Sequence, residues 1–95
     1  MSIVIVGGNE GMTGKYKELC EDYKCKVKVY AKKAGSMKGM GSPDLLVLFT
    51  NTMSHKMLRN VLNETKGQNV KVERSRSSSI AALKTILDKN VIVSA

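Results

Sequence analysis

Two unbroken apolar runs constrain the fold of this chain more than any other feature of its sequence. Residues 3–6 (Ile-Val-Ile-Val) and residues 45–49 (Leu-Leu-Val-Leu-Phe) contain no polar position. Such runs are typical of strands in parallel sheets with both faces covered, because a strand with one wet face alternates apolar and polar residues. The sequence therefore predicts a helix-covered sheet in which these two runs are the central strands.

The remaining elements alternate along the chain in the order β-α-β-β-α-β-α-β. Apolar residues recur at helical spacing near positions 16–23, 57–62 and 80–87, which predicts three helices. Residues 25–30 and 70–73 alternate in hydropathy, as half-covered strands do, and residues 91–93 form a candidate fifth strand. Right-handed crossovers then favour the strand order 2-1-3-4, with the fifth strand beside the fourth. The predicted fold is a small doubly wound α/β domain, Rossmann-like or flavodoxin-like, with a mostly parallel sheet and three helices.

Length and composition favour a single domain over residues 1–95. Residues 31–43 have no clear period and contain Lys32, Lys33 and Lys38, which predicts a mobile basic loop where a second crossover helix would be expected. Cys20 and Cys25 form no CxxC pair and are interpreted as reduced thiols. Since no apolar run reaches membrane-spanning length and residues 3–6 are too short for a signal-peptide core, we expect a cytoplasmic protein that does not bind membranes.

The charge of the chain favours an anionic partner. Sixteen Lys and Arg residues against eight Asp and Glu residues leave a net charge of +8. A surface for a nucleotide, a phosphorylated metabolite or nucleic acid is one interpretation, and a solvated basic surface is the other. Because the chain has one Phe and no Trp, we do not expect an aromatic platform for stacking bases.

Three polar loops are expected to converge where the winding of the sheet reverses, at the carboxyl ends of the first and third strands. The first is a glycine loop, whose backbone N–H groups could face an anion at a helix start. Its candidate ligand-binding residues are Gly7, Gly8, Asn9, Glu10 and Gly11. The spacing departs from both the Walker A loop and the dinucleotide fingerprint. The alternative interpretation is a tight turn that requires small residues.

The second loop follows the second apolar run and contains the only histidine of the chain. Its candidate residues are Asn51, Thr52, Ser54 and His55. One histidine makes no metal cluster, and the alternative is a histidine that is exposed or caps the helix. A hydrolytic triad of Ser54, His55 and Asp44 is excluded, because Asp44 begins its strand at the opposite edge of the sheet.

The third loop carries the strongest anion signal. Arg74, Ser75, Arg76, Ser77 and Ser78 precede the last predicted helix. Guanidinium groups, serine hydroxyls and free N–H groups at a helix start all suit phosphate oxygens. The alternative is a serine-capped helix with solvated arginines.

Several of these residues carry a family resemblance that extends over nearly the whole chain. They are Gly7-Gly8 after the first strand, Tyr16, Asp44, the Ser54-His55 pair and Arg74-Ser75. With them the chain resembles the family catalogued as domain of unknown function 2325, which implies the same fold and site position. Many members look like they carry cysteines before the Ser-His pair and in the following helix. Here Thr52, Met53 and residues 63–65 occupy those places, so the resemblance implies no thiol chemistry for this chain.

The leading hypothesis for function is a non-enzymatic domain that binds a small anionic, nucleotide-like ligand. The ligand would lie between the glycine loop, His55 and the two arginines, and a homodimer would deepen the shallow crevice. A basic adaptor for nucleic acid or protein is the alternative. An enzyme with His55 as acid or base is a third hypothesis, although the sequence shows no partnered nucleophile or carboxylate pair for it. No metal and no cofactor are expected.

Overall fold

The computed structural model describes residues 1–30, 43–67 and 69–91. Four parallel strands form one sheet in the order β2-β1-β3-β4, which confirms the predicted fold class and strand order. The strands are β1 (Ser2–Gly7), β2 (Lys26–Tyr30), β3 (Leu45–Phe49) and β4 (Lys71–Ser75). The three predicted helices are α1 (Thr13–Asp22), α2 (His55–Glu64) and α3 (Ile80–Asn90), and two short 3-10 turns, η1 (Glu10–Met12) and η2 (Thr50–Thr52), precede the first two.

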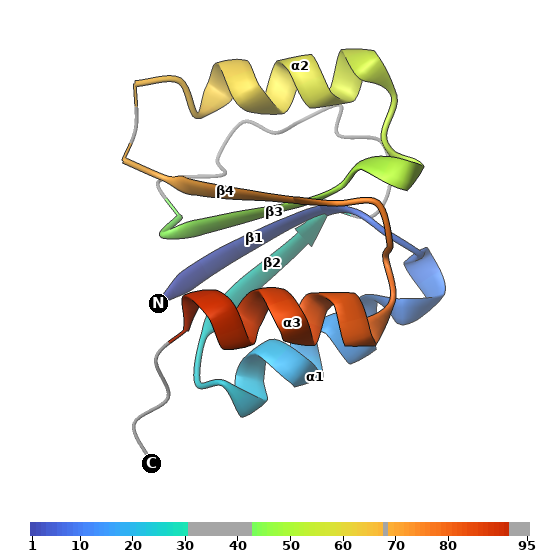
Figure 1. The fold of residues 1–95 in the computed structure, drawn as a ribbon, viewed down its shortest axis with the longest axis vertical. Helices are drawn as coiled ribbons and strands as arrows, with labels where there is room; N and C mark the ends of the chain where they lie inside the picture. The colour runs from blue at the N-terminus through green and yellow to red at the C-terminus, as the bar shows by residue number, and fades with distance from the viewer. Residues whose placement is uncertain (31–42, 68, 92–95) are drawn as a thin grey trace.

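Helices cover both faces of the sheet, and among the described residues α2 covers one face while α1 and α3 cover the other (Figure 1). The two unbroken runs are buried throughout because alternate side chains of β1 and β3 enter different cores. Val4, Val6, Leu46 and Leu48 pack with Val61 of α2, while Ile3, Ile5, Leu45, Val47 and Phe49 pack with α1 and α3. No helix in the described part of the chain is long and apolar enough to cross a membrane.

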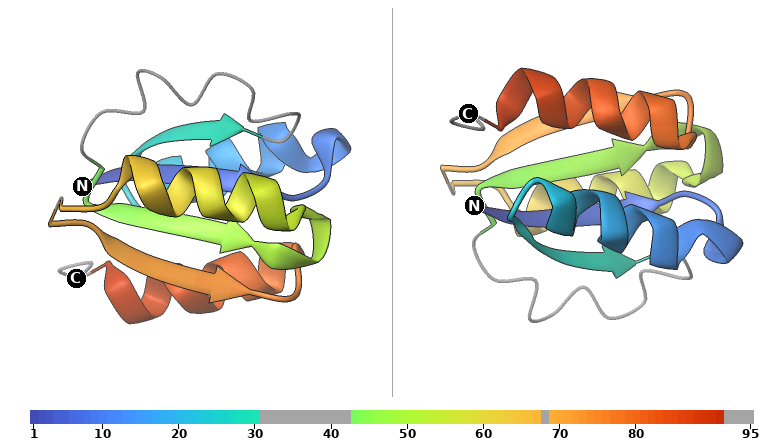
Figure 2. Two further views of the ribbon diagram at one scale, coloured as in Figure 1. Left: turned by 90° about the horizontal axis from the view of Figure 1, so that it is seen from above. Right: turned by 90° about the horizontal axis from the view of Figure 1, so that it is seen from below.

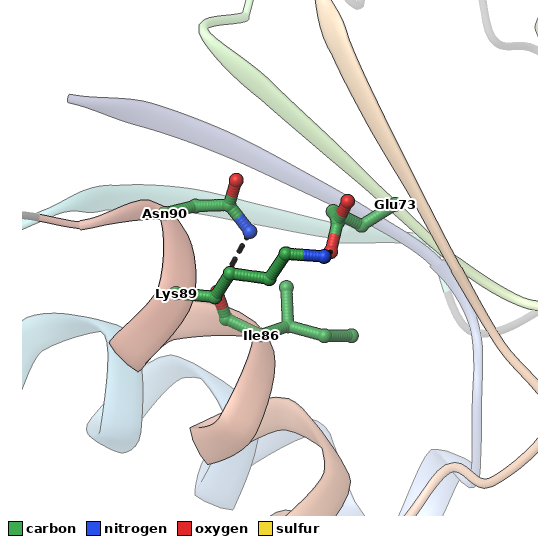
Figure 3. Close-up of polar contacts among 4 residues, drawn as sticks. All are labelled: Glu73, Ile86, Lys89 and Asn90. Carbon is green, nitrogen blue, oxygen red and sulfur yellow. Dashed lines mark hydrogen bonds and ion pairs between the residues drawn. The ribbon is translucent and has the colours of Figure 1, made fainter.

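The outer strands are half-covered, as their alternating sequences predict. Val27 and Val29 of β2 pack on the α1/α3 side, whereas Lys26 and Lys28 are exposed on the other. In β4, Val72 joins the α2-side core, and Glu73 points to α3. Figure 3 shows the second contact, in which Lys89 Nζ lies 3.7 Å from Glu73 Oε2 and the neighbouring Asn90 side chain donates to the carbonyl of Ile86.

The fourth strand extends further than its sequence pattern indicates. The prediction ended it at Glu73, but β4 continues through Arg74 and Ser75, which pair in parallel register with Leu48 and Phe49. The backbone ladder with β3 continues beyond the last apolar residue because its hydrogen bonds do not depend on side-chain polarity. Arg74 and Ser75 therefore belong to a strand end and not to the loop.

Two further predictions fall partly outside the described residues. Val91, the first residue of the expected fifth strand, is the C-cap of α3, and its N–H donates to the carbonyl of Leu87. The rest of that strand, residues 92 and 93, lies outside the described ranges, as do residues 31–42 of the expected basic loop. Pro43, at the end of that loop, is buried.

Candidate functional site

The three predicted loops meet at the carboxyl end of the sheet (Figure 2). Hydrogen bonds connect the three loops, two of them directly and one through a side chain of α1. The amide N of Gly8 donates to Thr52 Oγ1 at 2.6 Å, Thr50 Oγ1 donates to the carbonyl of Ser75 at 3.2 Å, and the Tyr16 hydroxyl donates to the carbonyl of Ser78 at 2.5 Å. The glycine loop, η2 and the segment between β4 and α3 are thus tied to one another.

The two glycines that end β1 are required by this close approach. Gly7 and Gly8 have φ angles of +86° and +91°, a region that L side chains rarely adopt. A Cβ on Gly7 would lie 2.8 Å from Thr52 Oγ1, and a Cβ on Gly8 would lie 2.9 Å from the ring of Tyr16. Neither position accommodates a side chain without displacing η2 or α1.

The backbone amides of the glycine loop are largely engaged within the protein. Besides the Gly8 bond, the amide of Asn9 donates to the Tyr16 hydroxyl at 3.3 Å. The amides of Gly11 and Met12 donate to the side-chain and backbone oxygens of Asn9, both at 2.9 Å. A phosphate cradle needs amides that point outward and lack acceptors. These four amides accord instead with the tight-turn interpretation of the loop.

Tyr16 is a central residue of this edge, and sequence reasoning assigned it only to the core face of the first helix. Its side chain is fully buried, and its ring lies against Phe49 with centroids 5.3 Å apart. The hydroxyl accepts from one loop and donates to another. A tyrosine at an otherwise apolar helix position is the sequence signal for such a role, because a buried tyrosine hydroxyl requires a polar partner.

In the second loop, the hydroxyl groups are also engaged. Thr52 Oγ1, which accepts from Gly8, donates to the carbonyl of Phe49 at 3.1 Å. Ser54 is the N-cap of α2, and its Oγ accepts from the amide of Met57 at 3.1 Å. The side chains of Asn51 and His55 are exposed beside them. His55 is the first residue of α2.

In the third loop, the serines bond to one another and cap α3. Ser75 Oγ donates to the carbonyl of Ser77 at 2.7 Å, and Ser77 Oγ donates to Ser79 Oγ at 3.1 Å. Ser79 Oγ accepts from the amide of Ala82 at 3.1 Å and is the N-cap. The predicted serine cap is therefore present, with Ser79 as the capping residue.

Arg74 and Arg76 differ from the serines around them. Both side chains are exposed, and neither guanidinium makes a hydrogen bond or ion pair with another described residue. Arg74 projects from the α2 side of the sheet, since Val72, two residues earlier, packs in the α2-side core. Its partner in the register is Leu48, two residues before η2. Arg74 thus lies beside the strand end that leads into α2, and Arg76 follows just beyond the end of β4.

Other residues with reactive groups lie away from this edge. Cys20 and Cys25 are buried and unlinked, and burial raises the pKa of the Cys20 thiol to about 12, with smaller contributions from Cys25 and Glu21. Such a thiol is inert at neutral pH. The Asp44 carboxylate accepts from the amide of Ser2 at the start of β1, at the other end of the sheet from His55. No group of three metal-ligating side chains occurs among the described residues.

One open hollow of about 290 Å³ lies in a different place. Its walls come from α1 and the start of α3, and it is lined by Lys15, Glu18, Leu19, Asp22 and Ile80. None of the residues predicted to bind a ligand contributes to it. The candidate site at the carboxyl end of the sheet therefore consists of the converging loops and the exposed cations, and this hollow is not part of it.

The fold and its loops define the class of this protein: a small parallel α/β domain with a polar, arginine-bearing edge at its strand ends. A family described as an uncharacterized protein conserved in bacteria, domain of unknown function 2325, matches residues 2–90. The chain belongs to this family, which confirms the resemblance inferred from its residues. No curated protein and no solved structure gives a significant match.

Proposed function

We propose that this domain binds a small anionic, nucleotide-like ligand at the carboxyl edge of its sheet, without catalysing a reaction on it. The observation that carries the proposal is the pair of exposed guanidinium groups, Arg74 and Arg76, which lack acidic partners among the described residues. Guanidinium groups form paired hydrogen bonds with phosphate oxygens. Two of them beside one strand end favour a ligand with at least one phosphate.

The surroundings of the two arginines favour a preorganised site. Arg74 is part of the β3–β4 ladder, and the carbonyl of the next residue, Ser75, accepts from Thr50. Two residues after Arg76, the carbonyl of Ser78 accepts from Tyr16. Because the backbone on both sides of Arg76 is held in this way, less conformational entropy would be lost when a ligand binds.

The hydrogen bonds divide the predicted site residues into two groups. Gly7, Gly8, Gly11, Thr52, Ser75 and Ser77 have their amides or hydroxyls in structural bonds or close contacts. We assign them to the scaffold of the site. Asn51 and His55 are exposed, and we assign them with the arginines to contact the ligand. The amide nitrogen of the exposed Asn9 side chain is a further contact for polar edges of the ligand.

Binding without catalysis is favoured by the same bonds. A serine or threonine hydroxyl becomes a stronger nucleophile when it donates its proton to an adjacent base. The Thr52 hydroxyl donates to the carbonyl of Phe49, and the Ser54 hydroxyl, which accepts from the amide of Met57, makes no hydrogen bond to His55 in the described part of the chain. A homodimer that faces two such shallow edges would enclose more of the ligand than one copy can. The two free cysteines favour a reducing compartment such as the cytoplasm for this activity.

Isothermal titration calorimetry with a panel of mononucleotides, cyclic dinucleotides and inorganic phosphate tests the proposal. We expect heat for at least one nucleotide, and a loss of about tenfold or more in affinity for Arg74→Ala or Arg76→Ala, since each removes a charge-assisted hydrogen bond. Lys71→Ala is the control, because Lys71 is an exposed cation at the amino end of β4, the opposite end of the strand that carries Arg74. The absence of heat for the wild-type protein with every compound, at high protein concentration, would refute the proposal.

A further inference from the structure

The outer face of α2 carries a row of basic and amide side chains. Val61 is fully buried, and Met57, Leu58 and Leu62 pack on the sheet, so the opposite side of the helix faces solvent. There the exposed residues Lys56, Arg59 and Asn63 follow one another at spacings of three and four, and the exposed Lys66 lies in the turn after the helix. These four residues are called the α2 row below, and the three on the helix extend along about 10 Å at the helical rise per residue.

The helical segment that contains the α2 row carries more positive charge than the two helices on the opposite face of the sheet do together. Together, α1 and α3 carry four basic and four acidic side chains: Lys15, Lys17, Lys84 and Lys89 against Glu18, Glu21, Asp22 and Asp88. The α2 helix has Glu64 as its one acidic residue. The α1 and α3 helices together therefore carry no net charge, whereas α2 with Lys66 carries a net charge of +2.

The sheet edge beside α2 adds to this charge. Lys26 and Lys28 of β2 are exposed on the α2 side, because their neighbours Val27 and Val29 pack on the opposite side. Figure 2 (left) shows α2 above the middle of the sheet with β2 at its edge. The cations thus form a surface that includes a helix and one flanking strand.

We propose that the outer face of α2 is a docking surface for duplex DNA, which adjoins the small-ligand edge at His55. An α-helix with its side chains is about 10–12 Å across, and the major groove of B-form DNA is about 12 Å wide. Since α2 is the sole described helix on its face of the sheet, no other described helix prevents it from entering a groove (Figure 1).

The side chains of the α2 row fit this partner. Lys56 and Lys66, at the two ends of the row, are placed to contact phosphates, while Arg59 and Asn63 between them can hydrogen-bond to base edges or phosphates. Double-stranded RNA has a major groove too narrow for a helix, and single strands are held by stacking on aromatic side chains. The α2 row contains no aromatic residue, which favours a duplex over a single strand.

Fluorescence anisotropy with a labelled duplex of random sequence tests this inference. Two charge-matched variants are compared. The α2 variant carries Lys56→Glu, Arg59→Glu and Lys66→Glu in the α2 row, and the control variant carries Lys15→Glu, Lys17→Glu and Lys84→Glu on α1 and α3. We expect the α2 variant to lose at least about tenfold in affinity, and its slope of log affinity against log salt to fall by about three. The control variant should lose less than about threefold, because long-range charge is screened by salt.

Three other outcomes would contradict DNA docking on α2. Equal losses in the two variants would show that net charge alone attracts DNA. Binding of double-stranded RNA or single-stranded DNA as tight as that of duplex DNA would exclude groove docking, and no binding by the wild-type protein would exclude a DNA surface. Circular dichroism verifies that both variants fold. A second pair, with Gln in place of Glu at the same positions, should reproduce the difference at smaller magnitude.

Discussion

The hydroxyl of Tyr16 donates to the carbonyl of Ser78 across 62 residues of sequence, and so ties α1 to the segment before α3. The same hydroxyl accepts from the amide of Asn9. One buried oxygen therefore joins two of the three loops at the candidate site, and its removal is the most direct test of their connection.

Tyr16→Phe should lower the free energy of unfolding by about 1–2 kcal/mol. The substitution keeps the ring against Phe49 but leaves the Asn9 amide and the Ser78 carbonyl without this partner. Urea unfolding followed by circular dichroism measures the change. Tyr30→Phe is the control, because the Tyr30 hydroxyl bonds to no described residue, and it should change stability by less than about 0.5 kcal/mol. Equal effects of the two substitutions would contradict the bridging role of Tyr16.

A methyl group at Gly8 should be far more costly than one at Gly14. At Gly8 it combines a left-handed backbone with contacts of 2.9–3.0 Å to Tyr16 and Phe49, which together cost about 2–4 kcal/mol. Gly14 lies within the first turn of α1 with open space at its Cβ position, so Gly14→Ala should stabilise the protein by up to about 1 kcal/mol. Thermal unfolding of the two variants compares them, and a Gly8→Ala variant as stable as wild type would exclude the described turn.

The sheet and its helices could be predicted because each rests on a local pattern. The runs at 3–6 and 45–49 indicate burial on both faces, and the lysines at 26 and 28 indicate an edge. The extent of β4 could not be predicted in this way. Arg74 and Ser75 are strand residues because β3 provides partners for their backbone, and that partner is more than twenty residues away in sequence.

The position of the candidate site could be predicted from the sequence, but the sequence does not show which of its residues are structural and which are free to contact a ligand. Polar residues after parallel strands indicate a shared edge, and the structure brings the three loops together there. Whether an amide or hydroxyl in such a loop is free depends on contacts with distant segments. Gly8 and Thr52 illustrate this. The Gly8 amide and the Thr52 hydroxyl are both groups that can hydrogen-bond to a ligand, but in this structure they bond to each other.

Lys24→Gly should stabilise the protein by roughly 0.5–1 kcal/mol. Lys24 follows the C-cap of α1 with φ at +57°, and the amides of Lys24 and Cys25 donate to the carbonyls of Glu21 and Cys20, the bonds of a Schellman motif. A non-glycine residue pays about 1 kcal/mol for this conformation, partly offset by the greater freedom of glycine when unfolded. Lys24→Ala removes the same charge without relieving the strain. It should therefore show no gain in the same urea titration.

Stability should fall between about pH 10 and pH 12 through the contact between Tyr23 and Asp88. The Tyr23 hydroxyl donates to Asp88 Oδ1, and this hydrogen bond, with smaller effects of desolvation and the negative charge of Asp88, raises the pKa of Tyr23 from 10.0 to about 12. A group whose pKa is higher when folded stabilises the fold in its protonated form. This contribution is complete below pH 10 and is lost as the pH rises through about 12.

Tyr23→Phe isolates this contribution from other groups that titrate at high pH, such as the Cys20 thiol, whose folded pKa is also about 12. We expect the stability difference between wild type and Tyr23→Phe to be constant from neutral pH to about pH 9 and to shrink toward pH 12, because only the wild-type protein loses the α1–α3 hydrogen bond. Urea unfolding of both proteins at stepped pH values measures the difference. A stability difference that stays constant across the whole pH range would show that the hydrogen bond to Asp88 does not raise the pKa of Tyr23.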